Sequence, residues 1–214
     1  MEDQLKVIRE TIIDGKHNDI EKLVQGALEL EIDPNRIIDQ AMIAAMDVVG
    51  ARFADNQIYV PEMLVSALTM KKGLNIIKPL LAEDAETSRE TIMMCTVKGD
   101  MHDIGKNLVT MMLEGAGFRV IDLGVDMSVE NVVAEVKKVR PSVLGLSALL
   151  TTTMPEMKRV IEALEQEGLR NDVKVMVGGA PVDAVFAENI RADGYGKDAT
   201  AAVELARRLV AERS

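Results

Sequence analysis

The sequence has 214 residues, 48% of them hydrophobic and 28% charged, which is enough for one large domain or two small ones with buried cores. A formal net charge of −10 and a pI near 4.8 leave no basic surface for nucleic acid or for an anionic membrane, and we expect neither partner. The N-terminus MEDQLKVIRE is charged and no long apolar run follows it, which favours a soluble, cytoplasmic protein.

The first half of the chain has the apolar spacing of amphipathic helices. Apolar residues recur every three or four positions in residues 5–12, 20–30, 36–53 and 63–81, and the prolines at 34 and 61 lie at breaks between these segments. This pattern predicts a bundle of about four helices. The charged stretch EDAETSRE (83–90) has no apolar period, and it suggests two domains, residues 1–88 and 89–214.

The second half alternates short apolar runs with amphipathic segments. The runs are TIMMCTV, FRVIDL, SVLGLS, VKVMVG and a short DGYG, and each is followed by a helix-like segment. Five such units predict an α/β fold with a doubly wound, five-stranded parallel sheet of the Rossmann or flavodoxin-like type. Ligands of such sheets bind at the carboxyl ends of the strands, where the strand order reverses.

The loop TVKGDMHDIGKN (96–107) follows the first predicted strand and contains one of the two histidines. A phosphate-binding P-loop fits it poorly, because five residues separate Gly99 from Gly105 and Asn107 stands where a hydroxyl is needed. Two histidines and one cysteine cannot supply the usual zinc ligands. A plain helix start, capped by Asp100 or Asp103, is the simplest structural interpretation.

The pattern Asp-x-His-x-x-Gly at residues 100–105 resembles the signature of cobalamin-binding domains. The loop is similar to that of cobalamin-dependent methionine synthase, and the similarity continues through FRVIDLGVDM, GLSALLTTTMPEM, VMVGGAPV and GYGKDA. In the first half, VVGARF and YVPEMLVSAL resemble the helical methyl-cap domain of that family. A chain with only these two modules looks like the small corrinoid proteins of anaerobic methyltransferase systems.

This resemblance implies a site around His102. Neutral imidazole is a good axial nitrogen ligand for cobalt, and a partner on its other nitrogen is needed to fix the tautomer. The resemblance gives the ligand role to His102, the partner role to Asp100, and the family's serine position, the third member of this proton relay, to Thr153. Implied contacts to the corrinoid are Gly99, Asp100, Met101, His102, Asp103, Ile104, Gly105, Ser147, Leu149, Thr151, Thr153, Gly178, Gly179, Asp198, Ala199 and, from the cap, Phe53 and Val60.

The resemblance also implies a function and partners. The chain would carry a methyl group on a cobalamin or related corrinoid that cycles through Co(I), Co(II) and methylated forms. It would act as a carrier rather than a stand-alone catalyst, in methanogenesis or acetogenesis. Implied partners are a substrate-specific methyltransferase, a second methyltransferase acting on coenzyme M or tetrahydrofolate, and a reductive activation protein. The alternatives are a cobalamin-binding sensor and a mutase subunit, neither of which is supported by an output domain or a partner barrel in the sequence.

Overall fold

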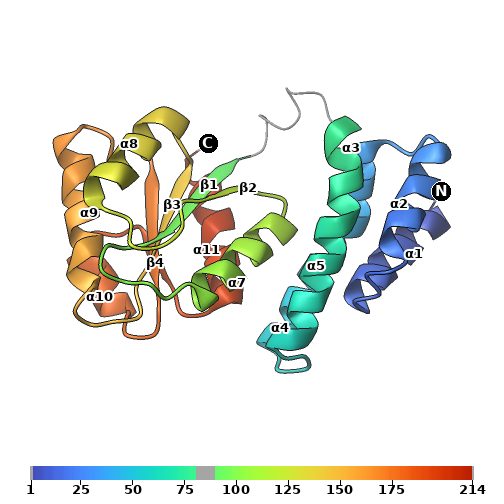
Figure 1. Ribbon diagram of the computed structural model, residues 1–214, viewed down its shortest axis with the longest axis horizontal. Coiled ribbons are helices and arrows are strands. Elements are labelled where there is room, and N and C mark those ends of the chain that lie inside the picture. The colour runs from blue at the N-terminus through green and yellow to red at the C-terminus, as the bar shows by residue number, and fades with distance from the viewer. Residues whose placement is uncertain (1, 81–89, 214) are drawn as a thin grey trace. The chain divides into compact units, whose positions relative to one another are not determined.

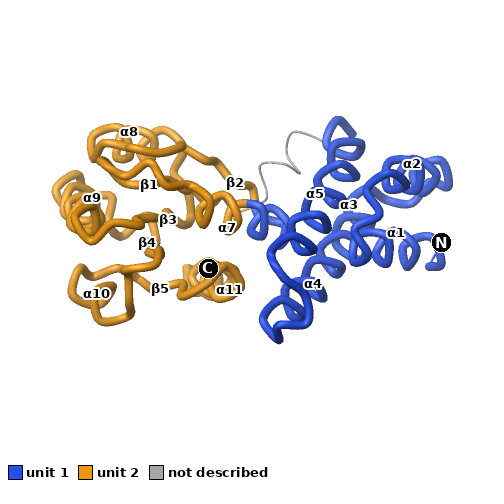
Figure 2. The backbone as a smooth tube through the Cα atoms, turned by 60° about the horizontal axis from the view of Figure 1, so that its bottom comes forward, with its two compact units in different colours: residues 1–89, 111–118 blue, residues 90–110, 119–214 orange. Residues whose placement is uncertain are grey.

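The computed structural model describes residues 2–80 and 90–213, which fall into two compact units (Figure 2). A helical unit comprises residues 1–89 with 111–118, and an α/β unit comprises residues 90–110 with 119–214. The domain boundary expected between residues 88 and 89, and the charged stretch up to residue 89, lie outside the described residues.

The helical unit consists of helices joined by short turns. Its elements are α1 (Glu2–Ile13), α2 (Ile20–Glu29), α3 (Pro34–Ile37), the π-helical turn η1 (Ile38–Ile43), α4 (Ala44–Ala54), α5 (Val60–Ile77) and the 3-10 turn η2 (Lys78–Leu80). The side chain of Asp33 caps α3 by accepting the Asn35 N–H at 2.8 Å, and Pro34 fills the first helical position, where no N–H is needed. The sequence predicted one helix over 36–53. The structure inserts a π turn there, because apolar spacing alone does not separate α from π geometry.

The α/β unit contains a five-stranded, all-parallel sheet with helices on both faces (Figure 1). Its elements are β1 (Thr91–Thr96), α7 (Ile104–Gly115), β2 (Arg119–Asp122), α8 (Val129–Val139), β3 (Val143–Ser147), α9 (Met154–Gln166), β4 (Lys174–Gly178), α10 (Ala184–Asn189), β5 (Gly194–Gly196) and α11 (Ala199–Ala211). The strand order is β2-β1-β3-β4-β5, so the order reverses at β1 and β3. The predicted fold, a helical region followed by a five-stranded parallel sheet, is confirmed.

Burial explains why the strands read as continuous apolar runs. A parallel sheet is covered on both faces, and β1 is buried from Ile92 to Thr96. Figure 1 shows α8, α9 and α10 on one face and α7 and α11 on the other. Met93, Cys95 and Val97 belong to the core cluster that packs with residues of α8, α9 and α10.

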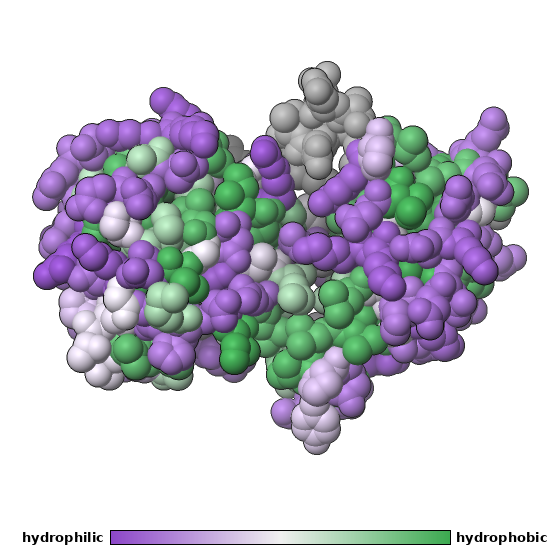
Figure 3. Space-filling view, viewed as in Figure 1, coloured by the Kyte–Doolittle hydropathy of each residue, from purple (hydrophilic) through white to green (hydrophobic). Residues whose placement is uncertain are grey.

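Polar residues cover much of the outside. In the view of Figure 3, hydrophilic residues make up much of the visible surface of both units, with hydrophobic patches between them. Among the described helices, none combines the length and the apolar character needed to cross a bilayer.

The single cysteine gives a direct test of the buried strand. Cys95 is fully buried, and burial, followed by the nearby charge of Asp122, raises the pKa of its thiol to about 12. Because the thiolate is the reactive form, we expect labelling of the folded protein by a disulfide reagent at about pH 8 to be slower than that of a free thiol by about 10³-fold or more. Full labelling in concentrated guanidinium chloride is the control. Native labelling at the rate of a free thiol would contradict the buried position of β1.

Candidate functional site

The carboxyl ends of the strands form a row that positions the predicted loop. Thr96 at the end of β1 pairs with Ser147 of β3, Ser147 pairs with Gly178 of β4, and Gly178 pairs with Gly196 of β5. Two predicted cofactor contacts, Ser147 and Gly178, therefore lie in the row from which the histidine loop emerges. The switch in strand order places this loop where α/β sheets bind ligands.

The loop after β1 folds back on its own strand. The Thr96 hydroxyl donates to the His102 carbonyl oxygen at 3.0 Å, and Gly99 adopts a positive φ of 79°, which glycine accommodates without strain. The loop after β2 supports it from one side, because the Gly99 N–H donates to Asp126 Oδ1 at 2.7 Å and the Asp126 N–H donates to the Asp100 carbonyl at 3.0 Å. These contacts fix the backbone on both sides of Asp100.

Asp100 is a fully buried carboxylate that accepts five hydrogen bonds. Its Oδ1 accepts the His102 N–H at 3.1 Å and contacts His102 Nδ1 at 2.7 Å. Its Oδ2 accepts the N–H groups of Leu149 and Leu150 at 2.7 and 3.1 Å and the Thr153 hydroxyl at 2.8 Å. The carboxylate thus ties the β1 loop to the loop after β3.

These donors keep Asp100 ionised. Burial alone would raise the pKa of the carboxyl, but the hydrogen bonds from Leu149, His102 and Thr153 outweigh burial and hold the pKa well below its usual range. An ionised carboxylate only accepts hydrogen bonds, so the proton between the two side chains resides on His102 Nδ1. In the neutral ring the lone pair is then on Nε2. Because the His102 side chain is 52% exposed, that ring is open to a ligand.

Thr153 occupies the position at which the resemblance implies a serine. It is buried immediately before α9, and its single hydroxyl proton has two acceptors, Asp100 Oδ2 at 2.8 Å and the Leu150 carbonyl at 2.9 Å. The structure therefore brings together Asp100, His102 and Thr153 as a connected set. The extra methyl group of threonine is accommodated without loss of the hydroxyl contact.

Exposed apolar residues lie near His102, either in sequence or in the loop that binds Asp100. Met101 and Ile104 flank it in sequence and are 68% and 85% exposed, and Leu149 and Leu150 beyond Asp100 are also exposed. At Gly105 an added Cβ would meet nothing within 4 Å, so the start of α7 is open. Exposed apolar side chains close to an exposed histidine ring indicate a ligand-binding surface.

The remaining predicted contacts are placed as follows. Gly179 has a positive φ of 126°, and a Cβ there would overlap the Ala148 carbonyl oxygen. The backbone conformation therefore requires glycine at this position whether or not the residue contacts a cofactor. Thr151 is exposed in the turn before α9. Asp198 caps α11 by accepting the Ala201 N–H at 2.8 Å, and Ala199 is buried in the first turn of that helix.

The two predicted cap residues belong to the helical unit. Phe53 is half-buried near the end of α4, and Val60 is 40% exposed at the start of α5. Their neighbour Met63 is fully buried and is part of the bundle core.

Sequence reasoning missed Thr96, Leu150 and Asp126. Thr96 reads as an ordinary β-branched strand residue, and Leu150 acts through its backbone, which residue type does not reveal. Asp126 lies in the quoted segment FRVIDLGVDM but received no role, because its contact with Gly99 depends on the register of two loops.

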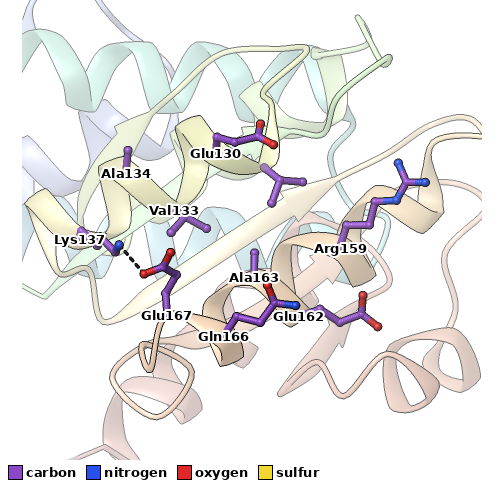
Figure 4. Close-up of a pocket in the computed structure, with 10 residues that line it drawn as sticks. Glu130, Val133, Ala134, Lys137, Arg159, Glu162, Ala163, Gln166 and Glu167 are labelled. Atoms are coloured by element: carbon purple, nitrogen blue, oxygen red, sulfur yellow. Dashed lines mark hydrogen bonds and ion pairs between the residues drawn. The ribbon is translucent and has the colours of Figure 1, made fainter.

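A concave surface lies away from the histidine loop, on the sheet face that α8, α9 and α10 cover. A groove of about 540 Å³ opens between α8 and α9, with Val133 and Ala163 among its lining residues (Figure 4). Lys137 and Glu167 on its wall form an ion pair at 2.6 Å. None of the predicted site residues lines this groove, and in the described part of the chain no group of three or more His, Cys, Asp or Glu residues is arranged to hold a metal ion.

Comparison with known proteins assigns both halves of the chain. A family model described as a B12 binding domain matches residues 90–204, and a second B12 binding domain model matches residues 4–78. A dimethylamine corrinoid protein of Methanosarcina barkeri is 41% identical, covering 98% of this chain and 99% of that protein. A corrinoid protein of Desulfitobacterium hafniense is 38% identical over 96% of this chain and 97% of its own.

Solved structures agree with these matches. A cobalamin-binding protein of Desulfitobacterium hafniense superposes with a TM-score of 0.79 at 32% identity, covering 96% of this chain and 98% of the other. The methanol:cobalamin methyltransferase complex of Methanosarcina barkeri contains a chain with a TM-score of 0.87 at 32% identity, and the match covers 98% of this chain and 80% of that one. Because the family models and the relatives account for the helical and the α/β parts alike, the chain belongs to the B12-binding corrinoid proteins of methyltransferase systems.

Proposed function

We propose that this chain is a methyl carrier, which receives a methyl group through a substrate-specific methyltransferase and passes it to a second methyltransferase acting on coenzyme M or tetrahydrofolate. The observation that carries the proposal is the exposed His102 ring, whose Nδ1 proton is held by the buried Asp100 carboxylate at 2.7 Å. A ring held in this way presents Nε2 as a ligand for a metal.

The residues present fit a corrinoid at this site. A corrinoid bound here would need a nitrogen ligand for its cobalt and an apolar surface against its ring system. His102 supplies the nitrogen, and Met101 and Ile104 supply exposed apolar groups on either side of it. The open space at Gly105 and the row of Ser147 and Gly178 beside the loop give further positions at which we place cofactor contacts.

When bound, the corrinoid supplies a cobalt centre that accepts and releases a methyl group. The chain's own residues control the proton on the imidazole. Asp100 stays ionised, so it stabilises a proton on His102 Nδ1 whether or not Nε2 is occupied. Thr153 adds a hydroxyl that can donate to Asp100 or turn to Leu150, so the negative charge on Asp100 can be compensated to different degrees.

The partners follow from the relatives. The named relatives are a dimethylamine corrinoid protein and a chain of a methanol:cobalamin methyltransferase complex, which supports a small methylated donor handled by a separate methyltransferase. We also propose a reductive activation protein as a partner. The division into residues 1–88 and 89–214 remains our proposal for the domains. In this proposal Phe53 and Val60 contact the corrinoid from the helical domain, and Asp198 and Ala199 contact it from the start of α11.

Corrinoid binding through His102 is directly testable. Reconstitution with hydroxocobalamin and removal of free ligand should leave one corrinoid per chain. In the Co(II) state, the electron paramagnetic resonance spectrum should show cobalt lines split into triplets by the axial nitrogen, and His102→Ala should abolish the triplets. His17→Ala is the matched control, because His17 lies between α1 and α2 in the helical unit. A protein that retains no cobalt refutes corrinoid binding, and triplets that persist in His102→Ala refute the ligand.

Replacing Asp100 by Asn should destabilise the α/β unit and disturb the ring. In one orientation the amide NH₂ group would face the His102 N–H, and in the other it would face the N–H groups of Leu149 and Leu150. Either way at least one buried backbone N–H loses its acceptor, which costs about 1–3 kcal/mol for each such group. Thr153→Val removes only one of five donors and should cost less, while Thr153→Ser should be close to wild type. Chemical denaturation at neutral pH measures all three variants.

The pH dependence of that loss has a definite sign. The pKa of Asp100 is lower in the folded than in the unfolded chain, so its ionised form stabilises the fold above about pH 4, the ordinary range of an aspartate. That contribution is lost progressively as the pH falls below this value. The difference in unfolding free energy between wild type and Asp100→Asn should therefore be largest near neutrality and shrink in acid. A difference that grows in acid would show that Asp100 is protonated in the native protein.

A further inference from the structure

Lys106 is a buried cation at a position where neither burial nor the helix favours one. Its residue is 3% exposed, and its side chain is 1% exposed. It lies in the first turn of α7, which starts at Ile104, and the amino-terminal end of a helix disfavours positive charge. A lysine is almost never buried unless it is paired. The burial of Lys106 therefore needs an explanation, which its contacts provide.

The Lys106 ammonium joins two elements. It forms an ion pair with Asp122 Oδ2 at the end of β2, and it donates to Asn107 Oδ1 at 2.8 Å. The other oxygen of Asp122 accepts the Gly124 N–H at 2.9 Å, so this carboxylate is itself held in place. The first turn of α7 is thus attached to the carboxyl end of the neighbouring strand.

The connection continues to the residue after His102. Asn107 accepts from Lys106 through its Oδ1 and donates through its Nδ2 to Asp103 Oδ2 at 3.0 Å, which settles the orientation of its amide. The Asn107 backbone N–H also donates to the Asp103 carbonyl at 2.7 Å. A single chain of contacts therefore runs from Asp122 through Lys106 and Asn107 to Asp103.

His102 is consequently held from two directions. On its amino-terminal side, Asp100 binds its ring and its N–H. On its carboxyl-terminal side, the next residue is fixed by the Lys106 connection. Lys106 follows Gly105 as the lysine of a phosphate-binding loop follows its glycine, whereas Asn107 stands where such a loop has a hydroxyl. Here the lysine faces a carboxylate inside the protein, and the following asparagine passes the contact back toward the histidine.

We propose that Lys106 is a positioning residue for His102, which holds the segment from Asp103 to Asn107 against β2 so that the imidazole keeps one orientation. This inference rests on the proposed function only for its consequence in corrinoid binding. The orientation itself belongs to the protein without the corrinoid, and it can be measured there.

Nuclear magnetic resonance of ¹⁵N-histidine-labelled protein without corrinoid provides the test. The chain has two histidines, so His17 serves as an internal reference. Wild type should give one set of His102 ring signals with the proton on Nδ1. Lys106→Met keeps the length of the buried stem and removes the charge, and it should shift and broaden the His102 signals while leaving those of His17 unchanged.

Lys98→Met is the matched control. Lys98 lies in the same loop but is exposed, so the same chemical change should leave the His102 signals as in wild type. Lys106→Met leaves the Asp122 carboxylate without its partner, and breaking a buried ion pair in this way lowers stability. Denaturation therefore measures the stability of each variant separately, and the His102 signals are compared only under conditions in which the variant is folded. If Lys106→Met does not fold, Asp122→Asn removes the other half of the pair and should change the His102 signals in the same way.

The corrinoid supplies an independent second measurement. Contacts that orient a metal ligand typically change affinity by about 10–100-fold, and we expect hydroxocobalamin to bind Lys106→Met about 10-fold more weakly than Lys98→Met. Unchanged His102 signals in a folded Lys106→Met or Asp122→Asn protein would overturn the positioning role. Altered His102 signals in a chain that binds no corrinoid would leave the positioning role standing and refute the proposed function instead.

Discussion

The site depends on the burial of one carboxylate. Asp100 has no exposed surface, and an ionised group in that position is tolerated only because five donors surround it. Three of these donors are backbone N–H groups of two different loops, so the loop after β1 and the loop after β3 have to adopt their observed conformations together. The orientation of the His102 ring is a consequence of that same arrangement, because the ring supplies one of the five donors. The shape of the loops and the chemistry of the imidazole therefore cannot vary independently.

Strand order explains why the two loops meet at all. The sheet order β2-β1-β3-β4-β5 puts β1 beside β3, so that Thr96 and Ser147 are partners at the carboxyl edge. The chain leaves β1 toward α7 and leaves β3 toward α9, which lie on opposite faces of the sheet (Figure 1). The loop after β1 and the loop after β3 therefore diverge, and His102 in the first loop is exposed between them. A buried aspartate that accepts from the β3 loop joins the loops at their base and leaves the histidine above it.

Much of this organisation could be predicted from the sequence, because apolar periodicity reports burial directly. The continuous apolar runs predicted the strands. The spacing of Asp100, His102 and Gly105, through its resemblance to a cobalamin-binding signature, indicated which loop carries the site. Other features depend on contacts that residue types do not encode. Leu149 and Leu150 contribute N–H groups, which every residue except proline carries. Lys106 was given no role in the sequence analysis, and its burial depends on the place where β2 ends, which periodicity fixes only to within a few residues.

The polar and apolar parts of the site are separated in a way that suits a cofactor that offers a metal together with the face of a large ring. Polar atoms are concentrated below the ring, where Asp100, Thr153 and Thr96 are buried and satisfied by one another and by backbone groups. Four residues of the β1 and β3 loops expose large apolar side chains: Met101, Ile104, Leu149 and Leu150. Such side chains contact a macrocycle through its area and distinguish little between small methylated molecules, since discrimination of that kind needs buried polar groups matched to the substrate. Selection among methyl donors would therefore be better served by a partner methyltransferase than by the surface around His102, as our proposal of a methyl carrier requires.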